Sequence, residues 1–171
     1  MRIKKFIFLI FTCFITYNGI FAQSLGKMTL GCKRSDIPFS LPNGYNVCKT
    51  STDNQLTYTT AQGNEYVSFY LNNGIVHTII MHKHIGNGSD TNGFKSKLED
   101  TILSLYELWG EPSYIGENIY WHFPTSKATI TYEVTSSTMP DPLMFSGYSY
   151  VTTYHCYMDI KLEKRTRNIF E

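Results

Sequence analysis

An alternating pattern near the C-terminus most strongly constrains how this chain can fold. The segment YSYVTTYHCYMDIKLEK, residues 148–164, alternates between two sets of side chains. The mostly apolar set is Tyr150, Tyr154, Cys156, Met158, Ile160 and Leu162. The other set is Val151, Thr153, His155, Tyr157, Asp159, Lys161 and Glu163. Successive side chains of a strand point to opposite faces. The pattern therefore predicts an antiparallel sheet that is covered on one face and open to solvent on the other.

A tight hairpin is predicted in EYVSFYLNNGIVHTIIMHK, residues 65–83. Two runs rich in β-branched and aromatic residues flank Asn72-Asn73-Gly74, and Asn-Gly supplies the positive φ angles that a two-residue turn needs. Three shorter strands are predicted in QLTYTT (55–60), NIYWHF (118–123) and KATITYEV (127–134). The segment 136–147, which contains two prolines, is expected to be a connector.

One amphipathic helix is predicted between the strands. Its apolar stripe consists of Phe94, Leu98, Ile102, Leu105 and Trp109. These residues recur at steps of three and four, and Gly110 followed by Pro112 ends the helix. The predicted fold is α+β: an antiparallel sheet of about six strands packed on one main helix. Because the element order resembles two similar halves, a degenerate tandem repeat is a further hypothesis, although no residue-level repeat is visible.

The N-terminus is typical of a secretory signal peptide. Arg2, Lys4 and Lys5 precede an apolar run, Phe6 to Ile15, and a small residue, Ala22, offers a cleavage site. We therefore expect a signal peptide at 1–22, a single α+β domain at 23–171, and export to a bacterial periplasm or medium. The apolar run is shorter than the about 20 residues that span a bilayer. Acylation of Cys13 is the alternative, disfavoured because Phe11 and Thr12 precede it where small residues are expected.

Charge and motifs exclude several functions. Without its leader the chain has 12 basic and 14 acidic residues, a net charge of −2, so a nucleic-acid partner has no electrostatic support. No second apolar run of membrane-spanning length follows the leader, so we do not expect stable insertion into a membrane. No phosphate loop, nucleophile elbow or Cys-x-x-Cys motif is present. We expect no cofactor and no enzymatic activity.

The cysteines suggest a crosslink near the N-terminus. Export favours disulfides, and a Cys32–Cys48 bridge would close a loop of about 16 residues, contributing about 3 kcal/mol to stability. Cys156 would then be a buried thiol on the core face. Sequence alone leaves the connectivity open, and a reactive cysteine is an alternative.

The second half resembles a family of small exported bacterial proteins of unassigned function. The resemblance lies in LYELWGEPSYIGENIYWHFPTSKATITYEV, where a helix ends in Gly-x-Pro and a Trp-bearing strand follows, and in the later step Tyr157-Met158-Asp159. The resemblance covers about residues 94–163. The segment LGCKRSDI (30–37) is weakly similar to the start of the first helix in the same domains. More distantly, the chain is similar to outer-membrane-assembly lipoproteins and beta-lactamase inhibitory protein. The resemblance implies a helix on an antiparallel sheet, and a binding or scaffolding role.

The wet face of the sheet is the candidate site. Tyrosine combines a large contact area with a polar tip, which suits recognition surfaces. The candidate binding residues are Tyr120, His122, Val151, His155 and Tyr157. We therefore expect a binding protein for an envelope or secreted partner, although these tyrosines are also compatible with the edge of the core.

A metal-dependent hydrolase is the alternative function. His82 and His84 share one side of a strand, and this i, i+2 geometry can chelate a metal if His122 or His155 supplies a third ligand. The simpler interpretation is that the two histidines are solvated at the end of a strand.

Overall fold

The computed structural model describes residues 24–48, 50–140 and 150–165, so the predicted signal peptide lies outside the described residues. The main sheet consists of β3 (Tyr45–Val47), β4 (Gln55–Thr60), β5 (Tyr66–Asn72), β6 (Ile75–Gly88), β7 (Tyr114–Ile115), β8 (Ile119–His122), β9 (Ser126–Pro140) and β10 (Tyr150–Lys164). A small hairpin of β1 (Ser24–Leu25) and β2 (Met28–Thr29), then η1 (Arg34–Asp36) and α2 (Ile37–Ser40), precede it. The long helix is α3 (Asn92–Trp109).

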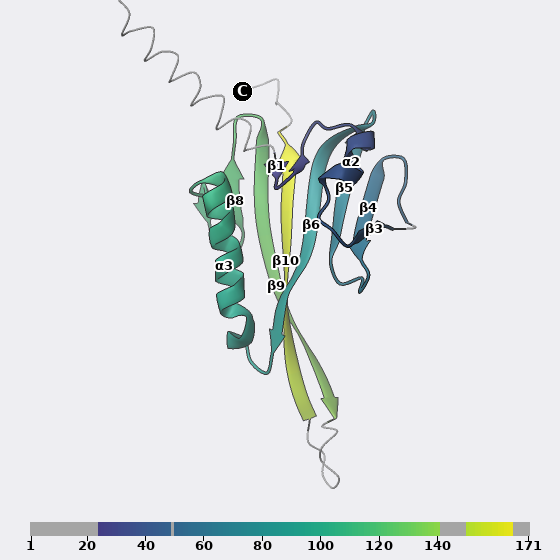
Figure 1. Ribbon diagram of the computed structural model, residues 1–171. Coiled ribbons are helices and arrows are strands. Elements are labelled where there is room, and N and C mark those ends of the chain that lie inside the picture. Colours follow the sequence, from purple (N-terminus) through teal and green to yellow (C-terminus); the bar gives the residue numbers. More distant parts are fainter. Residues whose placement is uncertain (1–23, 49, 141–149, 166–171) are drawn as a thin grey trace, which may run out of the picture.

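The fold is α+β, with one large antiparallel sheet in the order β3-β4-β5-β6-β10-β9-β8-β7 (Figure 1). Each of the six predicted strands is present. The expected count of six is too low for this sheet, because β3 and β7 add two short edge strands without a strong sequence pattern. The tandem repeat is not confirmed: the helix that precedes the first meander has 4 residues and the one that precedes the second has 18.

The predicted hairpin is confirmed at β5 and β6. Asn73 (φ 51°) and Gly74 (φ 74°) form its turn, and both angles are positive as a type I′ turn requires. The pairing runs from Asn72↔Ile75 to Tyr66↔His82. This register places Tyr66 and His82 on the same face of the sheet.

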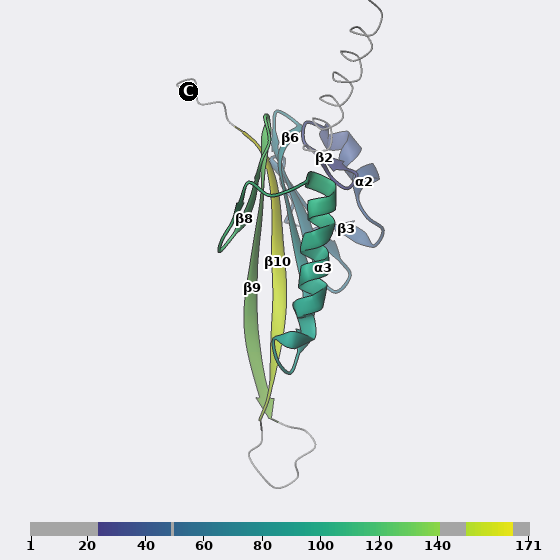
Figure 2. The same cartoon turned by 90° about the vertical axis from the view of Figure 1, so that its left-hand side faces the viewer.

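Helix α3 packs on one face of the sheet, as its stripe predicts (Figure 2). Phe94, Leu105 and Trp109 are buried, and Leu98 and Ile102 pack against the same core. The helix begins close against β6, because a Cβ on Gly86 would come within 3.2 Å of the Phe94 Cβ. At its other end Gly110 has φ 78° and its N–H donates to the Tyr106 carbonyl, so the predicted stop is confirmed.

The helix does not cover this face alone. Four buried side chains of the N-terminal segment join the same core: Leu25, Met28, Leu30 and Ile37. The indole N–H of Trp109 donates to the Ser24 carbonyl at 3.1 Å, which ties this segment to the end of α3. Residues 24–43 therefore supply another part of the covering layer.

The long strands β9 and β10 continue beyond the helix (Figure 1). Pairing extends from Lys164↔Ser126 to Tyr150↔Pro140 without a register shift. Residues 136–140 are therefore strand, not connector, because a long partner satisfies their backbone groups. Three side chains lie on the core face yet are exposed: Tyr150 in this extension, and Tyr132 and Val134, which lie on β9 opposite the buried Met158 and Cys156.

The structure does not contain the predicted Cys32–Cys48 disulfide. The carbonyl of Cys32 accepts a hydrogen bond from Val76, and Lys33 bridges Ile75, so this segment borders β6 on the side where β10 lies. Cys48 follows β3, and its N–H donates to the Thr57 carbonyl of β4. Several strand spacings of about 4.8 Å separate the two cysteines, and a disulfide needs Cα atoms within about 7 Å. The two thiols are too far apart because β4, β5 and β6 lie between them.

Candidate functional site

The two faces of β10 are the ones that its alternation predicts. Cys156, Met158, Ile160 and Leu162 are buried in the core beneath the covering layer. Tyr157 points to the opposite face and is half-buried. The candidate site must therefore be built on the face that α3 and residues 24–43 leave open.

Five aromatic side chains gather on that open face. Tyr66 comes from β5, His82 and His84 from β6, and His155 and Tyr157 from β10; we call this set the aromatic row. Strand pairing places Tyr66 opposite His82, and His84 opposite Tyr157. The row therefore crosses the centre of the sheet over three adjacent strands.

The rings at the centre of the row stack on one another. The centroids of Tyr66 and His82 are 4.8 Å apart with planes 10° from parallel, and those of His82 and Tyr157 are 5.3 Å apart at 17°. His84 lies 5.1 Å from Tyr157 and 6.1 Å from His155. Near-parallel rings at strand spacing cover each other's faces. Their edges, with the hydroxyl and imidazole groups, are what a partner would meet.

His82 is held by an acidic residue that sequence analysis did not find. Asp159 lies directly opposite it on β10, and Nδ1 of His82 donates to Oδ1 of Asp159 at 2.7 Å. The sequence gives no local sign of this contact, because the two positions are 77 residues apart. Burial, and next the negative charge of Asp159, raise the pKa of the Tyr66 hydroxyl. This hydroxyl therefore stays protonated and can donate.

His84 is the least satisfied member of the row. Its Nε2 is buried and has no hydrogen-bond partner among the described residues. A register shift in β6 opposite the Cys156–Tyr157 step adds one residue beside His84. By contrast, Nε2 of His155 lies 3.2 Å from the Ser137 hydroxyl. A buried polar atom without a partner costs roughly 1–3 kcal/mol.

A small hollow of about 200 Å³ adjoins the row. It is lined by His82, Thr131, Tyr132, Glu133, Tyr157 and Asp159. Glu133 lies opposite Tyr157 on β9, and Asp159 lies opposite Thr131. Two carboxylates and aromatic edges therefore surround the hollow. The nearby Lys161 ammonium is engaged by Glu163 at 2.6 Å.

The structure brings only part of the predicted binding set together. His155 and Tyr157 belong to the aromatic row. Tyr120 and His122 share its face but lie on β8, opposite Thr129 and Lys127, and the Lys127 ammonium sits 4.9 Å from the Tyr120 ring centroid. Val151 is in the β9–β10 extension. The alternation of side chains in each strand predicted the correct face for these residues. It could not predict which of them lie close together on that face.

The predicted metal pair, His82 and His84, also belongs to the aromatic row. No group of three histidine, cysteine or acidic residues able to hold a metal ion is found in residues 24–48, 50–140 and 150–165. Within the same ranges, none of the helices is both long and apolar enough to cross a bilayer.

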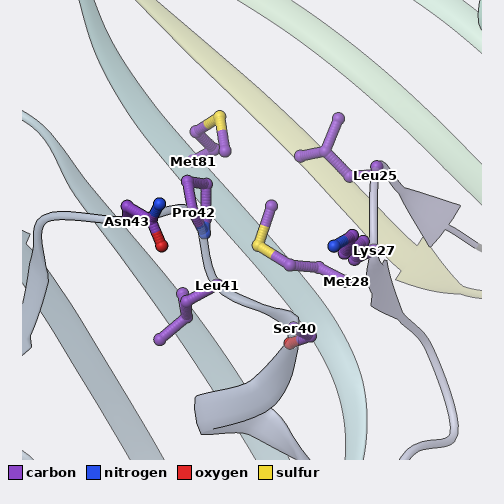
Figure 3. Close-up of a pocket in the computed structure, with 9 residues that line it drawn as sticks. Leu25, Lys27, Met28, Ser40, Leu41, Pro42, Asn43 and Met81 are labelled. Carbon is purple, nitrogen blue, oxygen red and sulfur yellow. The ribbon is translucent and has the colours of Figure 1, made fainter.

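A second hollow lies on the covered face, between the N-terminal segment and β6 (Figure 3). Its volume is about 450 Å³. Its lining consists of Leu25, Gly26, Lys27, Met28, Ser40, Leu41, Pro42, Asn43 and Met81. The hollow is a gap in the covering layer, and among its lining residues only Lys27 is charged.

No protein-family model, curated protein or solved structure matches this chain.

Proposed function

We propose that this protein is an exported, non-enzymatic binding protein that docks an envelope or secreted protein against its open sheet face. The observation that carries the proposal is the stacked row of Tyr66, His82 and Tyr157 across three strands. Tyrosine is enriched in protein interfaces because it offers contact area at low entropic cost. The stacking fixes these rings before a partner arrives, which lowers that cost further.

The orientation of the rings favours a protein partner over a flat, ring-shaped ligand. A sugar or a base stacks on the face of an aromatic ring, and at the centre of the row Tyr66 and Tyr157 cover the two faces of His82. The edges instead present polar groups such as the hydroxyl of the half-buried Tyr66. Such groups suit the irregular hydrogen-bonding surface of a folded protein.

The hollow beside the row suggests what the partner inserts. Glu133 and Asp159 supply negative charge, and Tyr157 supplies an aromatic edge. Arginine combines a delocalised positive charge with a planar shape that pairs with carboxylates and packs on rings. We therefore infer that the docking surface of the partner carries an arginine that enters the hollow.

The test is capture from the periplasmic or secreted fraction of the source cell, followed by binding of the purified captured protein. Tyr157→Ala should weaken that binding by at least tenfold, about 1.4 kcal/mol, because it removes the centre of the row. Tyr114→Ala is the matched control, since Tyr114 is exposed on β7 away from the row. Equal binding by both variants would contradict the proposal.

The metal-dependent hydrolase is the second candidate, favoured by one observation. Asp159 accepts a hydrogen bond from His82, just as carboxylates behind metal-binding histidines accept a hydrogen bond that orients the ring. Metal analysis of the purified protein separates the two candidates. A binding protein should hold no stoichiometric zinc, whereas retained zinc that is lost in His82→Ala would establish a metal site.

A further inference from the structure

The outer edge of β9 is the longest open strand edge in the described part of the chain. Strand β8 pairs with residues 127–130 only, whereas β10 pairs with β9 as far as Pro140. From Thr131 onward no described strand lies on the outer side of β9, and Figure 2 shows this stretch at the free margin of the sheet. Its outward backbone N–H and C=O groups are a template for another strand.

This edge lacks the features that usually block such pairing. Proteins protect sheet edges with lysines, prolines, bulges or very short strands. The stretch 131–139, TYEVTSSTM, contains a single charge at Glu133 and no glycine, and the one proline of this edge, Pro140, is the last residue of the strand. Its pairing with β10 shows no register shift, and three of its apolar side chains are exposed: Tyr132, Val134 and Met139.

Two other margins of the sheet are protected in the expected ways. At the opposite side β3 has three residues, and the backbone beyond it continues to bond β4 through Cys48 N–H to the Thr57 carbonyl. The unpaired β5-side margin of β6, from Lys83 to Gly88, carries a lysine, two glycines and a register shift. The β9 edge is therefore an exception within this molecule.

We propose that the β9 edge pairs antiparallel with the same edge of a second copy of this chain. Antiparallel pairing of identical edges requires a two-fold axis perpendicular to the sheet, the commonest symmetry of protein dimers. An axis at Thr135 uses the whole stretch, with Thr131 opposite Met139 of the second copy. In this register Glu133 faces Ser137 of that copy. The two Glu133 side chains, one from each copy, therefore do not lie opposite each other.

The dimer would contain one sheet that runs continuously through both copies. A perpendicular two-fold axis leaves each face of the sheet on its own side. The aromatic rows of both copies would therefore point the same way, and one dimer would present two docking faces to a surface that bears several partners. The pairing itself does not depend on the proposed function.

The test compares the mass of the purified protein in solution with that of two lysine variants across the micromolar range. Val134→Lys places a charge on the β9 edge, where Val134 is 44% exposed and a longer side chain fits. Val47→Lys is the matched control on β3, where the valine is 60% exposed. Wild type and Val47→Lys should double in mass with concentration, and Val134→Lys should remain a single chain. Circular dichroism checks that both variants fold.

Amide hydrogen exchange gives a second readout. Residues 131–139 of the wild type should become protected as concentration rises, and residues 45–47 should not. A single-chain mass at all concentrations, or a dimer that persists in Val134→Lys, would overturn the proposal. Protection of the β9 edge that appears only when another protein is added would overturn it too. Tyr157→Ala separates this proposal from the proposed function. We expect this variant to lose partner capture and still form the dimer.

Discussion

Nδ1 of His82 donates to Oδ1 of Asp159 at 2.7 Å, directly across the pair of β6 and β10. The same imidazole stacks between Tyr66 and Tyr157. One side chain therefore joins three strands on the open face through two ring contacts and one hydrogen bond. This relationship gives the aromatic row its rigidity, and it leads to the first prediction.

His82→Ala should lower the free energy of unfolding by about 1–2 kcal/mol, because it removes two cross-strand ring contacts and a charged hydrogen bond. His122→Ala should change it by less than about 0.5 kcal/mol, since His122 is an exposed histidine at the end of β8. Urea denaturation measures both values. Equal losses would mean that the stacked row does not stabilise the sheet.

Leu105→Ala should be much more costly than Leu103→Ala. Both residues lie on α3, but Leu105 is 5% exposed and Leu103 is 57% exposed. Truncation of a buried leucine costs about 2–5 kcal/mol because it leaves a cavity, whereas the surface change should stay within about 0.5 kcal/mol. Thermal and urea unfolding measure the difference. Similar values would show that the helix packs in another rotation.

Stability should fall at alkaline pH partly because of Cys156. Burial raises the pKa of this thiol above its ordinary value of 9.0. Below pH 9 the thiol is protonated in both states, so it has no effect there. Above that value the unfolded state loses the proton first, and stability falls until the pH passes the raised pKa of the folded state.

The measurement is the urea midpoint between pH 8 and 10. The wild type should lose more stability over this range than Cys156→Ala, in which the tyrosines and the other thiols are unchanged. Parallel curves for the two proteins would contradict a buried, protonated thiol at this position.

Cys32 should react with iodoacetamide without prior reduction. The structure gives it a half-buried thiol with no disulfide. Burial, and next the charge of Asp36, raise its pKa, so the reaction should accelerate as the pH rises above neutrality because the thiolate is the nucleophile. Peptide mapping under non-reducing conditions detects the adduct. A linked Cys32–Cys48 peptide would instead show that the N-terminal segment packs differently.

Local patterns were sufficient for the elements and their faces. Asn73-Gly74 predicted the hairpin turn, because few residues accept two successive positive φ angles. The stripe from Phe94 to Trp109 predicted the helix and its buried side, and Gly110 predicted its end. Alternation in β10 separated Cys156 from Tyr157, because side-chain direction in a strand follows from the backbone alone.

Only the tertiary structure decided what lies beside what. The sequence predicted that His82 and Tyr157 face solvent, but only the pairing of β6 with β10 stacks them and brings Asp159 opposite His82, and only the pairing of β5 with β6 adds Tyr66. The order of β3, β4, β5 and β6 separated Cys32 from Cys48, which lie close in sequence, and the pairing of β9 with β10 extended β9 through residues expected to be a connector. A single sequence specifies in which direction each side chain of a strand points. The order and register of the strands depend on packing between residues far apart in the chain, and a local sequence pattern does not contain that information.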